Sequence, residues 1–336
     1  MIRKAMLYVT EEHDRVRCDL CAHRCRIAPA QRGICGVREN RDGALYTLVY
    51  GEVIAEHIDP IEKKPLFHVM PGSQSLSVAT VGCNFQCTFC QNHDISQMPR
   101  ITGRIMGQER TPEDIVSRAL STGCRSIAYT YTEPTIFFEY AYDIATLAHD
   151  RGIKNIFVTN GYQTPDAIDT IAPILDAANV DLKAYQDSFY KEFCGARLLP
   201  VLEALKRLKE QNVWLEVTTL IIPTLNDSDA ELRDIARFIA ALGTETPWHI
   251  SRFHPQYEMT NLPPTPIATI HRAAEIGREE GLLYVYSGNV PGDNGEKTRC
   301  PGCGTLLIDR YGFSVNGMNL TDGSCPSCGR KIEGIL

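Results

Sequence analysis

The sequence lacks any long apolar run. None of its hydrophobic stretches approaches the roughly 20 residues that a membrane-spanning helix needs. Residues 1–10 also lack the apolar core of a secretion signal. We therefore expect a cytoplasmic protein that does not contact a membrane.

An excess of basic residues is also absent. The chain has 34 Lys and Arg against 41 Asp and Glu, a formal net charge of −7. Nucleic-acid binding without sequence preference needs a basic surface, so nucleic acid is not indicated as a partner, although a local basic groove stays open. The 43% hydrophobic and 22% charged residues are typical of a globular protein. The length of 336 residues suits one barrel-sized domain with appendages, or two ordinary domains.

Cysteine, by contrast, is abundant. Most of the 13 cysteines fall into three close-spaced groups of four, three and four. Repeated C-x2-C pairs are typical of metal sites rather than of a disulfide framework. We therefore expect metal at these groups, and we interpret the remaining Cys124 and Cys194 as ordinary thiols.

The middle group has the spacing C-x3-C-x2-C, formed by Cys83, Cys87 and Cys90. Three thiolates are one short of a closed tetrahedral zinc site or of a fully ligated iron–sulfur cube, so a bound metal keeps an open position. Soft ligands this close together favour zinc or iron–sulfur over hard cations. The spacing suits a [4Fe–4S] cluster with one substrate-binding iron, and the alternative is a structural zinc knuckle.

At these residues the sequence resembles the radical S-adenosylmethionine (SAM) enzymes, whose signature is this spacing with an aromatic residue before the last cysteine, here Phe89. The flanking segments 82–84 and 90–92 also match. The resemblance implies that the open iron binds SAM and that an electron from the cluster cleaves SAM to a 5′-deoxyadenosyl radical. It also implies an electron donor such as flavodoxin or ferredoxin.

The likeness extends from about Cys18 to at least His254. The segment 59–73, taken with the amino-terminal cysteines and residues 82–92, is similar to the radical SAM component of the AmmeMemoRadiSam system. That group is related to the glycyl-radical (pyruvate formate-lyase) activating enzymes. The resemblance therefore implies protein partners from that system.

Strand-like and helix-like segments alternate from Ser75 onward, which is the pattern of an α/β fold with a parallel sheet. Six or seven such units predict a partial (β/α)6-type barrel, the fold of the radical SAM enzymes. We expect a Cys-rich extension with a β-hairpin (44–50 and 52–57) over residues 1–73, the barrel over 74–290, and a zinc-ribbon-like module over 296–336. Helix starts are marked at Thr111-Pro112 and Thr164-Pro165 and within 227–229. The predicted barrel strands are 75–81, 126–131, 154–159, 179–184, 213–221, 249–253 and 282–286.

Polar residues follow the predicted strands, where barrel enzymes carry their reactive groups. These strand-end residues are Cys83, Glu133, Asn160, Lys183 and His254. We therefore expect all five on one face of the barrel.

The resemblance implies SAM contacts for several of them. Glu133, in the segment that matches Gly-Gly-Glu-Pro, would bind the SAM ammonium. Lys183 in the Asp181-Leu-Lys183 motif, together with His254, would face the SAM carboxylate, and Phe89 would lie near the adenine. Asn160 belongs to a segment that matches an Asp-Thr-Asn-Gly motif.

The sequence departs from the family motifs at two positions. Thr132 replaces a glycine of the Gly-Gly-Glu-Pro segment, and Val158 replaces the Asp of the Asp-Thr-Asn-Gly motif. The structural alternatives are also specific. Glu133 could cap a helix, Asp181 and Lys183 could form a local ion pair, and His254 could be an ordinary hydrogen-bonded histidine.

The outer cysteine groups predict two further metal centres. The first has glycines nearby that permit tight turns, and its spacing fits either structural zinc or an auxiliary iron–sulfur cluster. The last pairs flank a hairpin with its turn expected at Asn316-Gly317, and they predict a closed zinc site or a rubredoxin-like iron site in a module that folds around its metal. The groups are Cys18, Cys21, Cys25 and Cys35, and Cys300, Cys303, Cys325 and Cys328.

Three functions remain open from the sequence. The first is a radical SAM enzyme that abstracts hydrogen from a macromolecular substrate. The second is an activating enzyme that places a glycyl radical on a partner enzyme. The third is a binding scaffold with several zinc ions and no catalysis.

Overall fold

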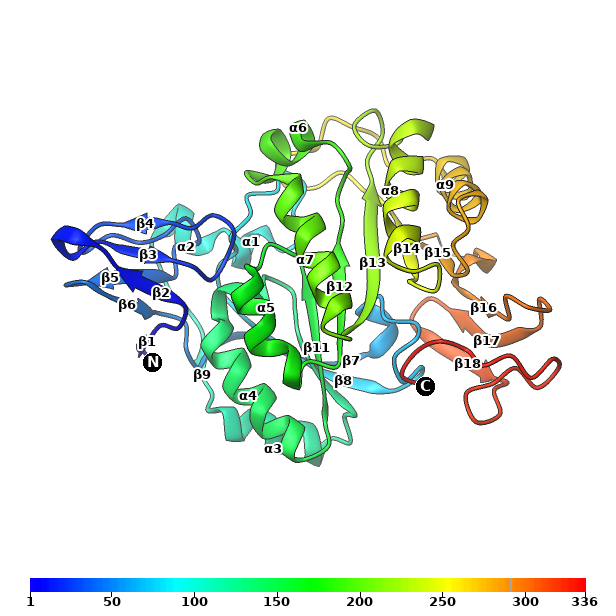
Figure 1. Cartoon of the computed structure of the whole chain (residues 1–336), viewed down its shortest axis with the longest axis horizontal. Coiled ribbons are helices and arrows are strands. Elements are labelled where there is room, and N and C mark those ends of the chain that lie inside the picture. Colours follow the sequence, from blue (N-terminus) through cyan, green and yellow to red (C-terminus); the bar gives the residue numbers. More distant parts are fainter. Residues whose placement is uncertain (291) are drawn as a thin grey trace.

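The computed structural model describes residues 1–290 and 292–336, and its centre is one nine-stranded sheet (Figure 1). The strand order is β15-β14-β13-β12-β11-β10-β8-β7-β9. Strands β8 and β10 to β15 pair in parallel, whereas β7 and β9 extend one edge antiparallel. Their bounds are β7 Glu52–Pro60, β8 Gln74–Thr80, β9 Gln108–Glu109, β10 Ser126–Tyr129, β11 Lys154–Thr159, β12 Ala177–Asp181, β13 Trp214–Ile221, β14 Trp248–Arg252 and β15 Val285–Gly288.

The predicted alternation of strands and helices is confirmed. All seven predicted strands are observed, and the largest shifts are of three residues: β12 ends three residues earlier than expected and β15 begins three residues later. The sheet also includes β7, from residues expected in the extension. The helices are α1 His93–Ser96, α2 Met98–Thr102, α3 Pro112–Ser121, α4 Phe138–Asp150, α5 Pro165–Ile171, α6 Asp187–Phe189, α7 Leu198–Glu210, α8 Asp229–Leu242 and α9 Ile267–Glu279.

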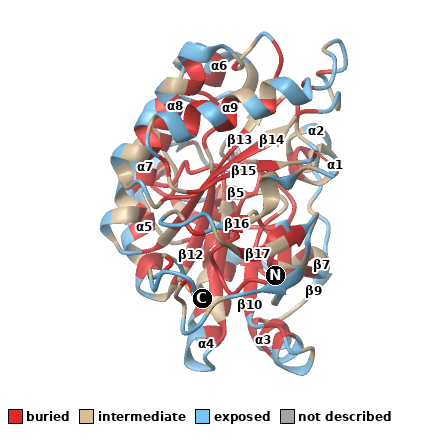
Figure 2. Cartoon of the chain, turned by 90° about the vertical axis from the view of Figure 1, so that its right-hand side faces the viewer, coloured by how far each residue is buried: buried red, intermediate tan, exposed pale blue. Residues whose placement is uncertain are grey.

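The helices pack against the sheet with buried faces and present exposed faces to solvent (Figure 2). Strand residues such as Ile127 and Val217 join helix residues such as Ile144 in one apolar core. The expected caps are present: the Thr111 side chain accepts a hydrogen bond from Asp114 N, and Thr164 accepts one from Ala167 N. None of the described helices is both long and apolar enough to cross a membrane.

The amino-terminal segment forms two small antiparallel sheets beside the main sheet (Figure 1). The predicted hairpin across Gly51 is wrong: β6 pairs with β1 and β5, whereas β7 pairs with β8. Gly51 still makes a turn at φ 74°, but β7 runs on into the main sheet, where β8 offers a longer partner. The small strands are β1 Arg3–Lys4, β2 Tyr8–Thr10, β3 Val16–Cys18, β4 Arg26–Ile27, β5 Arg38–Arg41 and β6 Ala44–Thr47.

The carboxyl-terminal segment forms a three-stranded sheet of β16 (Thr298–Arg299), β17 (Leu306–Tyr311) and β18 (Ser314–Met318). Its hairpin turns at Gly312-Phe313 because Tyr311 pairs with Ser314 and Gly312 adopts φ 58°. The expected turn at Asn316-Gly317 is therefore wrong, and both residues lie within β18.

This segment does not stand alone. Its apolar residues Leu307, Ile308 and Ile332 share one core with Phe67, Tyr284 and Tyr286 of the rest of the chain. The module expected over 296–336 therefore shares its apolar core with the main domain and does not form a separate unit.

Candidate active site and cysteine centres

The predicted strand-end residues lie at one edge of the parallel sheet. Cys83 follows β8, Glu133 follows β10, Asn160 follows β11 and Lys183 follows β12. Parallel strands bring their carboxyl ends to the same edge, so residues far apart in sequence meet there. His254 also follows its strand, β14, but its side chain is exposed.

The cysteine loop after β8 is largely buried. Cys83 and Cys87 are buried and Cys90 is half-buried. The backbone N–H of Phe85 donates to Cys83 Sγ at 3.4 Å, and Cys90 Sγ lies 3.4 Å from Ser96 Oγ. Burial raises the pKa of Cys83 and of Cys90.

The Cys87 thiol has a different environment. A hydrogen bond with the Cys194 thiol and the charge of Lys183 lower the pKa of Cys87, although burial opposes them. Cys194, which we interpreted from sequence as an ordinary thiol, is therefore part of this site. The spacing between Cys87 and Cys194 carries no signal that could have revealed this, because π-helix η5 (Tyr190–Cys194) brings the second thiol in from after β12.

Lys183 places a positive charge beside the cysteine loop. Its Nζ lies 2.9 Å from Asp181 Oδ2 and 5.8 Å from the centre of the Phe89 ring. Burial by itself lowers the pKa of Lys183, but Asp181, Cys87 and Cys194 outweigh it and hold this pKa well above its usual range. The ion pair anticipated as a structural alternative is present, and the Lys183 charge also lies near the Cys87 and Cys194 side chains.

Glu133 is fully buried and already hydrogen-bonded within the protein. Its Oε1 accepts from Thr135 N at 3.0 Å and Thr159 Oγ1 at 2.7 Å, and its Oε2 accepts from Asn160 N at 2.8 Å. Burial raises the pKa of Glu133, and these donors partly oppose the shift. Glu133 therefore caps the short helix η3 (Pro134–Phe137) and joins the ends of β10 and β11. Its role toward the SAM ammonium stays a prediction.

Asn160 connects this carboxylate to the cysteine loop. Its Nδ2 donates to Asn84 Oδ1 at 2.7 Å and lies 3.8 Å from Cys83 Sγ. The chain Glu133–Asn160–Asn84 thus holds the first cysteine of the loop against the ends of two strands. The sequence predicted Asn160 as a site residue, but it did not predict the role of its partner Asn84.

Tyr131 adopts a left-handed backbone conformation, with φ 63°. It occupies the first position of the segment that matches Gly-Gly-Glu-Pro, where glycine adopts this φ at no steric cost. Asn92 Nδ2 donates to Tyr131 O at 2.7 Å, so the strained turn touches the end of the cysteine loop. Thr132, which stands where the family motif has a glycine, also fits here, because its hydroxyl donates a hydrogen bond to Thr80 O at 2.8 Å.

Below this turn lies a buried ion pair that sequence reasoning missed. Lys64 Nζ donates to Asp59 Oδ2 at 2.7 Å, and Ser77 and Tyr131 donate to the same carboxylate. The Lys64 side chain is only 2% exposed, and burial lowers its pKa to about 8 against the opposing effect of Asp59. In the sequence, segment 59–73 stands out only by its family likeness, and nothing in it indicates this pair.

The loop after β14 also contacts the cysteine loop. Gln256 Nε2 donates to Gln91 O at 3.0 Å, and the Tyr257 ring stacks on His93 at 4.3 Å. These residues lie two and three positions beyond His254, and they, rather than His254, make the contacts seen here. No motif in the sequence singles them out.

The carboxyl-terminal cysteines converge on one point. Cys300 Sγ lies 3.5 Å from Cys328 Sγ, and Cys303 Sγ lies 3.6 Å from Cys325 Sγ. Sulfurs bound tetrahedrally to one zinc at about 2.3 Å would lie about 3.8 Å apart. The two C-x2-C turns match each other, since Gly304 N donates to Cys300 O and Gly329 N to Cys325 O, both at 2.8 Å. This donor set fits one metal ion.

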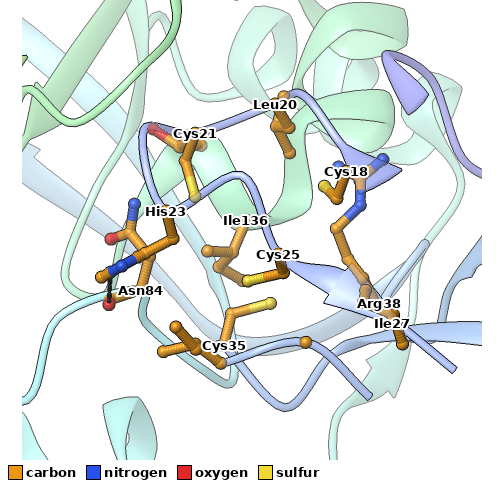
Figure 3. Close-up of a pocket in the computed structure, with 13 residues that line it drawn as sticks. Cys18, Leu20, Cys21, His23, Cys25, Ile27, Cys35, Arg38, Asn84 and Ile136 are labelled. Atoms are coloured by element: carbon orange, nitrogen blue, oxygen red, sulfur yellow. Dashed lines mark hydrogen bonds between the residues drawn. The ribbon is translucent and has the colours of Figure 1, made fainter. Parts of the chain in front are cut away.

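The amino-terminal cysteines surround a hollow instead (Figure 3). The pocket is lined by Cys18, Cys21, Cys25 and Cys35, by apolar side chains, and by Arg38 and Asn84. In the described residues, the carboxyl-terminal cysteines are the one set of three or more candidate ligands whose ligand atoms all lie within 4.8 Å of one another. The amino-terminal sulfurs are therefore more widely spaced than those of a single-ion site.

Comparison with known proteins defines the class. The family model of the radical SAM superfamily matches residues 77–239. The chain is 25% identical over 191 residues to the pyruvate formate-lyase-activating enzyme of Clostridium pasteurianum, which covers 54% of this chain and 77% of that protein. A solved radical SAM methyltransferase from Sphaerobacter thermophilus shares the fold, with a TM-score of 0.52 and 18% identity over 70% of this chain and 71% of the other.

A nearer relative covers the whole chain. The uncharacterized protein MJ0808 of Methanocaldococcus jannaschii is 47% identical over 338 residues, which is 100% of each chain. Together with the family match, this full-length likeness shows that the chain belongs to the radical SAM superfamily, in one family with MJ0808. It is a radical SAM enzyme, and its superfamily implies an iron–sulfur cluster and SAM as cofactors.

Proposed function

We propose that this enzyme reductively cleaves SAM at a [4Fe–4S] cluster held by Cys83, Cys87 and Cys90. The observation that carries the proposal is the three-thiolate loop at the carboxyl edge of the sheet, with the Lys183 cation beside it. When bound, the cluster supplies the electron that cleaves SAM to a 5′-deoxyadenosyl radical, which abstracts hydrogen from the substrate. Seven parallel strands lie side by side in the order in which they occur in the chain, which fits the partial (β/α)6-type barrel expected for such an enzyme.

The residues present fit the cluster. Three thiolates would leave one iron of a cube open, and Cys83, Cys87 and Cys90 are brought together on one short loop after β8. The Phe85 N–H already points at Cys83 Sγ, and Lys183 offsets the negative charge of the thiolates. Hydrogen bonds and charges of this kind tune iron–sulfur centres.

We place the SAM contacts among the residues at the carboxyl edge of the sheet. Lys183 would bind the SAM carboxylate, and Phe89 would pack near the adenine. Asp181 would orient Lys183 through their ion pair, and Asn160 would hold the loop through Asn84. Glu133 and His254 enter this set by family likeness, and both would need to turn toward the ligand, Glu133 by releasing an internal hydrogen bond.

The relatives also support a substrate class. The named activating enzyme acts on a protein, which supports a macromolecular substrate here, including the alternative that this enzyme installs a glycyl radical on a partner. A low-potential donor such as flavodoxin or ferredoxin would supply the electron. Protein components of the AmmeMemoRadiSam system are the partners proposed from sequence likeness. We assign one metal ion to the four carboxyl-terminal cysteines because their sulfurs match single-ion spacing, and we propose zinc for it, with rubredoxin-like iron as the alternative.

The first prediction tests the cluster. Replacing Cys83, Cys87 and Cys90 by Ala should remove one [4Fe–4S] cluster and abolish 5′-deoxyadenosine formation, because the thiolates are its ligands. Iron, acid-labile sulfide and EPR spectra after anaerobic purification measure the loss, with Cys124→Ala as the matched buried-cysteine control. Unchanged spectra in the triple variant would contradict the assignment, and zinc alone in the wild-type protein would favour the scaffold function.

The second prediction concerns Lys183. Its replacement by Ala removes one charged hydrogen bond to the SAM carboxylate, which should weaken SAM binding by about 1.5–3 kcal/mol, roughly ten- to a hundredfold. Equilibrium binding to the cluster-loaded protein measures this change. Lys191→Ala is the control, since Lys191 forms an exposed ion pair with Asp187. Equal SAM affinity in the Lys183→Ala variant and the wild type would contradict the role.

A further inference from the structure

The amino-terminal pocket contains a buried arginine with unused donors. Arg38 is 2% exposed, and its Nη2 donates to Met6 O and to Glu139 Oε1, both at 2.7 Å. Its Nε and Nη1 are buried and find no hydrogen-bond partner in the described part of the chain. Leaving buried charged donors unpaired is costly, and native structures rarely do so. The pocket that Arg38 lines therefore suits an anionic occupant.

The four cysteines around the same pocket define what that occupant is. Their sulfurs are spread around a hollow, whereas the four carboxyl-terminal sulfurs of the same chain converge as around one ion. A polynuclear cluster gives each thiolate its own iron and so needs the wider spacing. We infer that Cys18, Cys21, Cys25 and Cys35 hold a second [4Fe–4S] cluster, and that Arg38 donates its free N–H groups to the sulfurs of that cluster.

This second centre lies directly against the proposed SAM-binding cluster. Asn84 lines the pocket, and its Oδ1 is 3.8 Å from Cys83 Sγ. Arg100 on α2 donates to Ile34 O at 3.2 Å and to Cys83 O at 3.3 Å, which ties the two cysteine loops together. One layer of residues separates the two sites.

The arrangement makes the second cluster an electron relay, a role that rests on the function proposed above. When both clusters are bound, the residues at Cys18–Cys35 would hold a centre that could pass one electron to the oxidised cluster at Cys83–Cys90, and a low-potential ferredoxin or flavoprotein would restore that electron. The pocket has access to such a donor because Cys21, Cys25 and Cys35 are only partly buried and Ile34 is 42% exposed.

Acid-labile sulfide in the Cys83/Cys87/Cys90→Ala variant tests the second cluster by itself. We expect about four irons and four sulfides per chain to remain and to disappear on further replacement of Cys18 and Cys35 by Ala. The carboxyl-terminal site contributes no sulfide, since one ion there binds only thiolates. A triple variant with metal but no sulfide would overturn the inference. A triple variant that kept every cluster of the wild type would instead overturn the function proposed for Cys83, Cys87 and Cys90.

Two further measurements test Arg38 and the relay. Arg38→Lys keeps a charge for Glu139 but loses the guanidinium fork, so the midpoint potential of the second cluster should fall while that of the first stays. With both clusters reduced in the wild type, their EPR signals should show mutual broadening and faster relaxation, which Cys18→Ala with Cys35→Ala removes. An unchanged potential would overturn the role of Arg38. Two magnetically independent signals would overturn the relay.

Discussion

Single residues at the carboxyl edge combine structural and chemical roles. Glu133 caps a helix and accepts a hydrogen bond from Asn160 N, and Lys183 pairs with Asp181 beside the Cys87 side chain. The alternatives weighed from sequence were local contacts, and the structure shows that such contacts coexist with placement at the site. A residue can therefore satisfy a structural role and still lie where a ligand would bind.

Lys64 gives a pH-dependent prediction at this scale. An unfolded lysine keeps its proton up to about pH 10.5, whereas burial lowers the pKa of folded Lys64 to about 8. Between these values the unfolded state binds more protons, so the free energy of unfolding should rise with pH. We expect a gain of about 2 kcal/mol from pH 8 to pH 10.

Urea unfolding under anaerobic conditions at several pH values measures this slope. Lys64→Met should flatten it, because the titrating group is gone. Lys63→Met is the matched control, since this exposed lysine bonds to the same Asp59 carboxylate. The same slope in Lys64→Met and wild type would refute the role of burial.

At the scale of elements, the sequence predicted the starts of helices correctly but did not predict which strands pair over long distances in the chain. Thr111 and Thr164 begin their helices as predicted because a cap depends on residues within one turn. The hairpin across Gly51 failed because β7 pairs with β8, and nothing within the short segment reveals that choice. For the same reason the cysteine spacing predicted metal centres, whereas the Arg38–Glu139 pair, 101 residues apart, was invisible.

Gly82 gives a prediction at the contact between two loops. It adopts φ 106°, and a Cβ there would lie 2.7 Å from Val37 Cγ1. Gly82→Ala should therefore displace the cysteine loop, lower the cluster content and reduce stability by about 1–3 kcal/mol. Iron and sulfide content and urea unfolding measure both effects.

Two variants separate the clash from backbone strain. Gly123 also has a positive φ, 69°, but a Cβ there meets no atom within 4 Å, so Gly123→Ala should cost only about 1 kcal/mol and keep the cluster. Adding Val37→Ala to Gly82→Ala should restore part of the cluster content. If Gly82→Ala behaved like Gly123→Ala, the clash would not matter.

At the scale of the whole molecule, the carboxyl-terminal segment is joined to the main sheet by polar contacts as well as by apolar ones. Arg310 and Glu62 are both fully buried, with Nε and Oε1 3.4 Å apart. Arg310 also donates to Phe67 O at 2.7 Å and lies over the Phe67 ring at 4.3 Å. A second contact joins the same two parts of the chain, since His68 Nδ1 hydrogen-bonds to Glu333 O at 2.7 Å. The four-cysteine site is thus held against residues of the main sheet that the segment buries.

Removing Arg310 should therefore destabilise the whole chain. Arg310→Met leaves Glu62 buried without its cation, which should lower the free energy of unfolding by about 3–5 kcal/mol. Adding Glu62→Gln removes the unpaired charge and should recover much of that loss. Arg237→Met is the control, because its pair with Glu280 is exposed and such pairs contribute at most about 1 kcal/mol. Urea unfolding read both by zinc release and by far-UV circular dichroism should show one shared transition, because segment and sheet form a common core. Zinc release at lower urea than the loss of helix signal would show instead that the segment unfolds independently of the sheet.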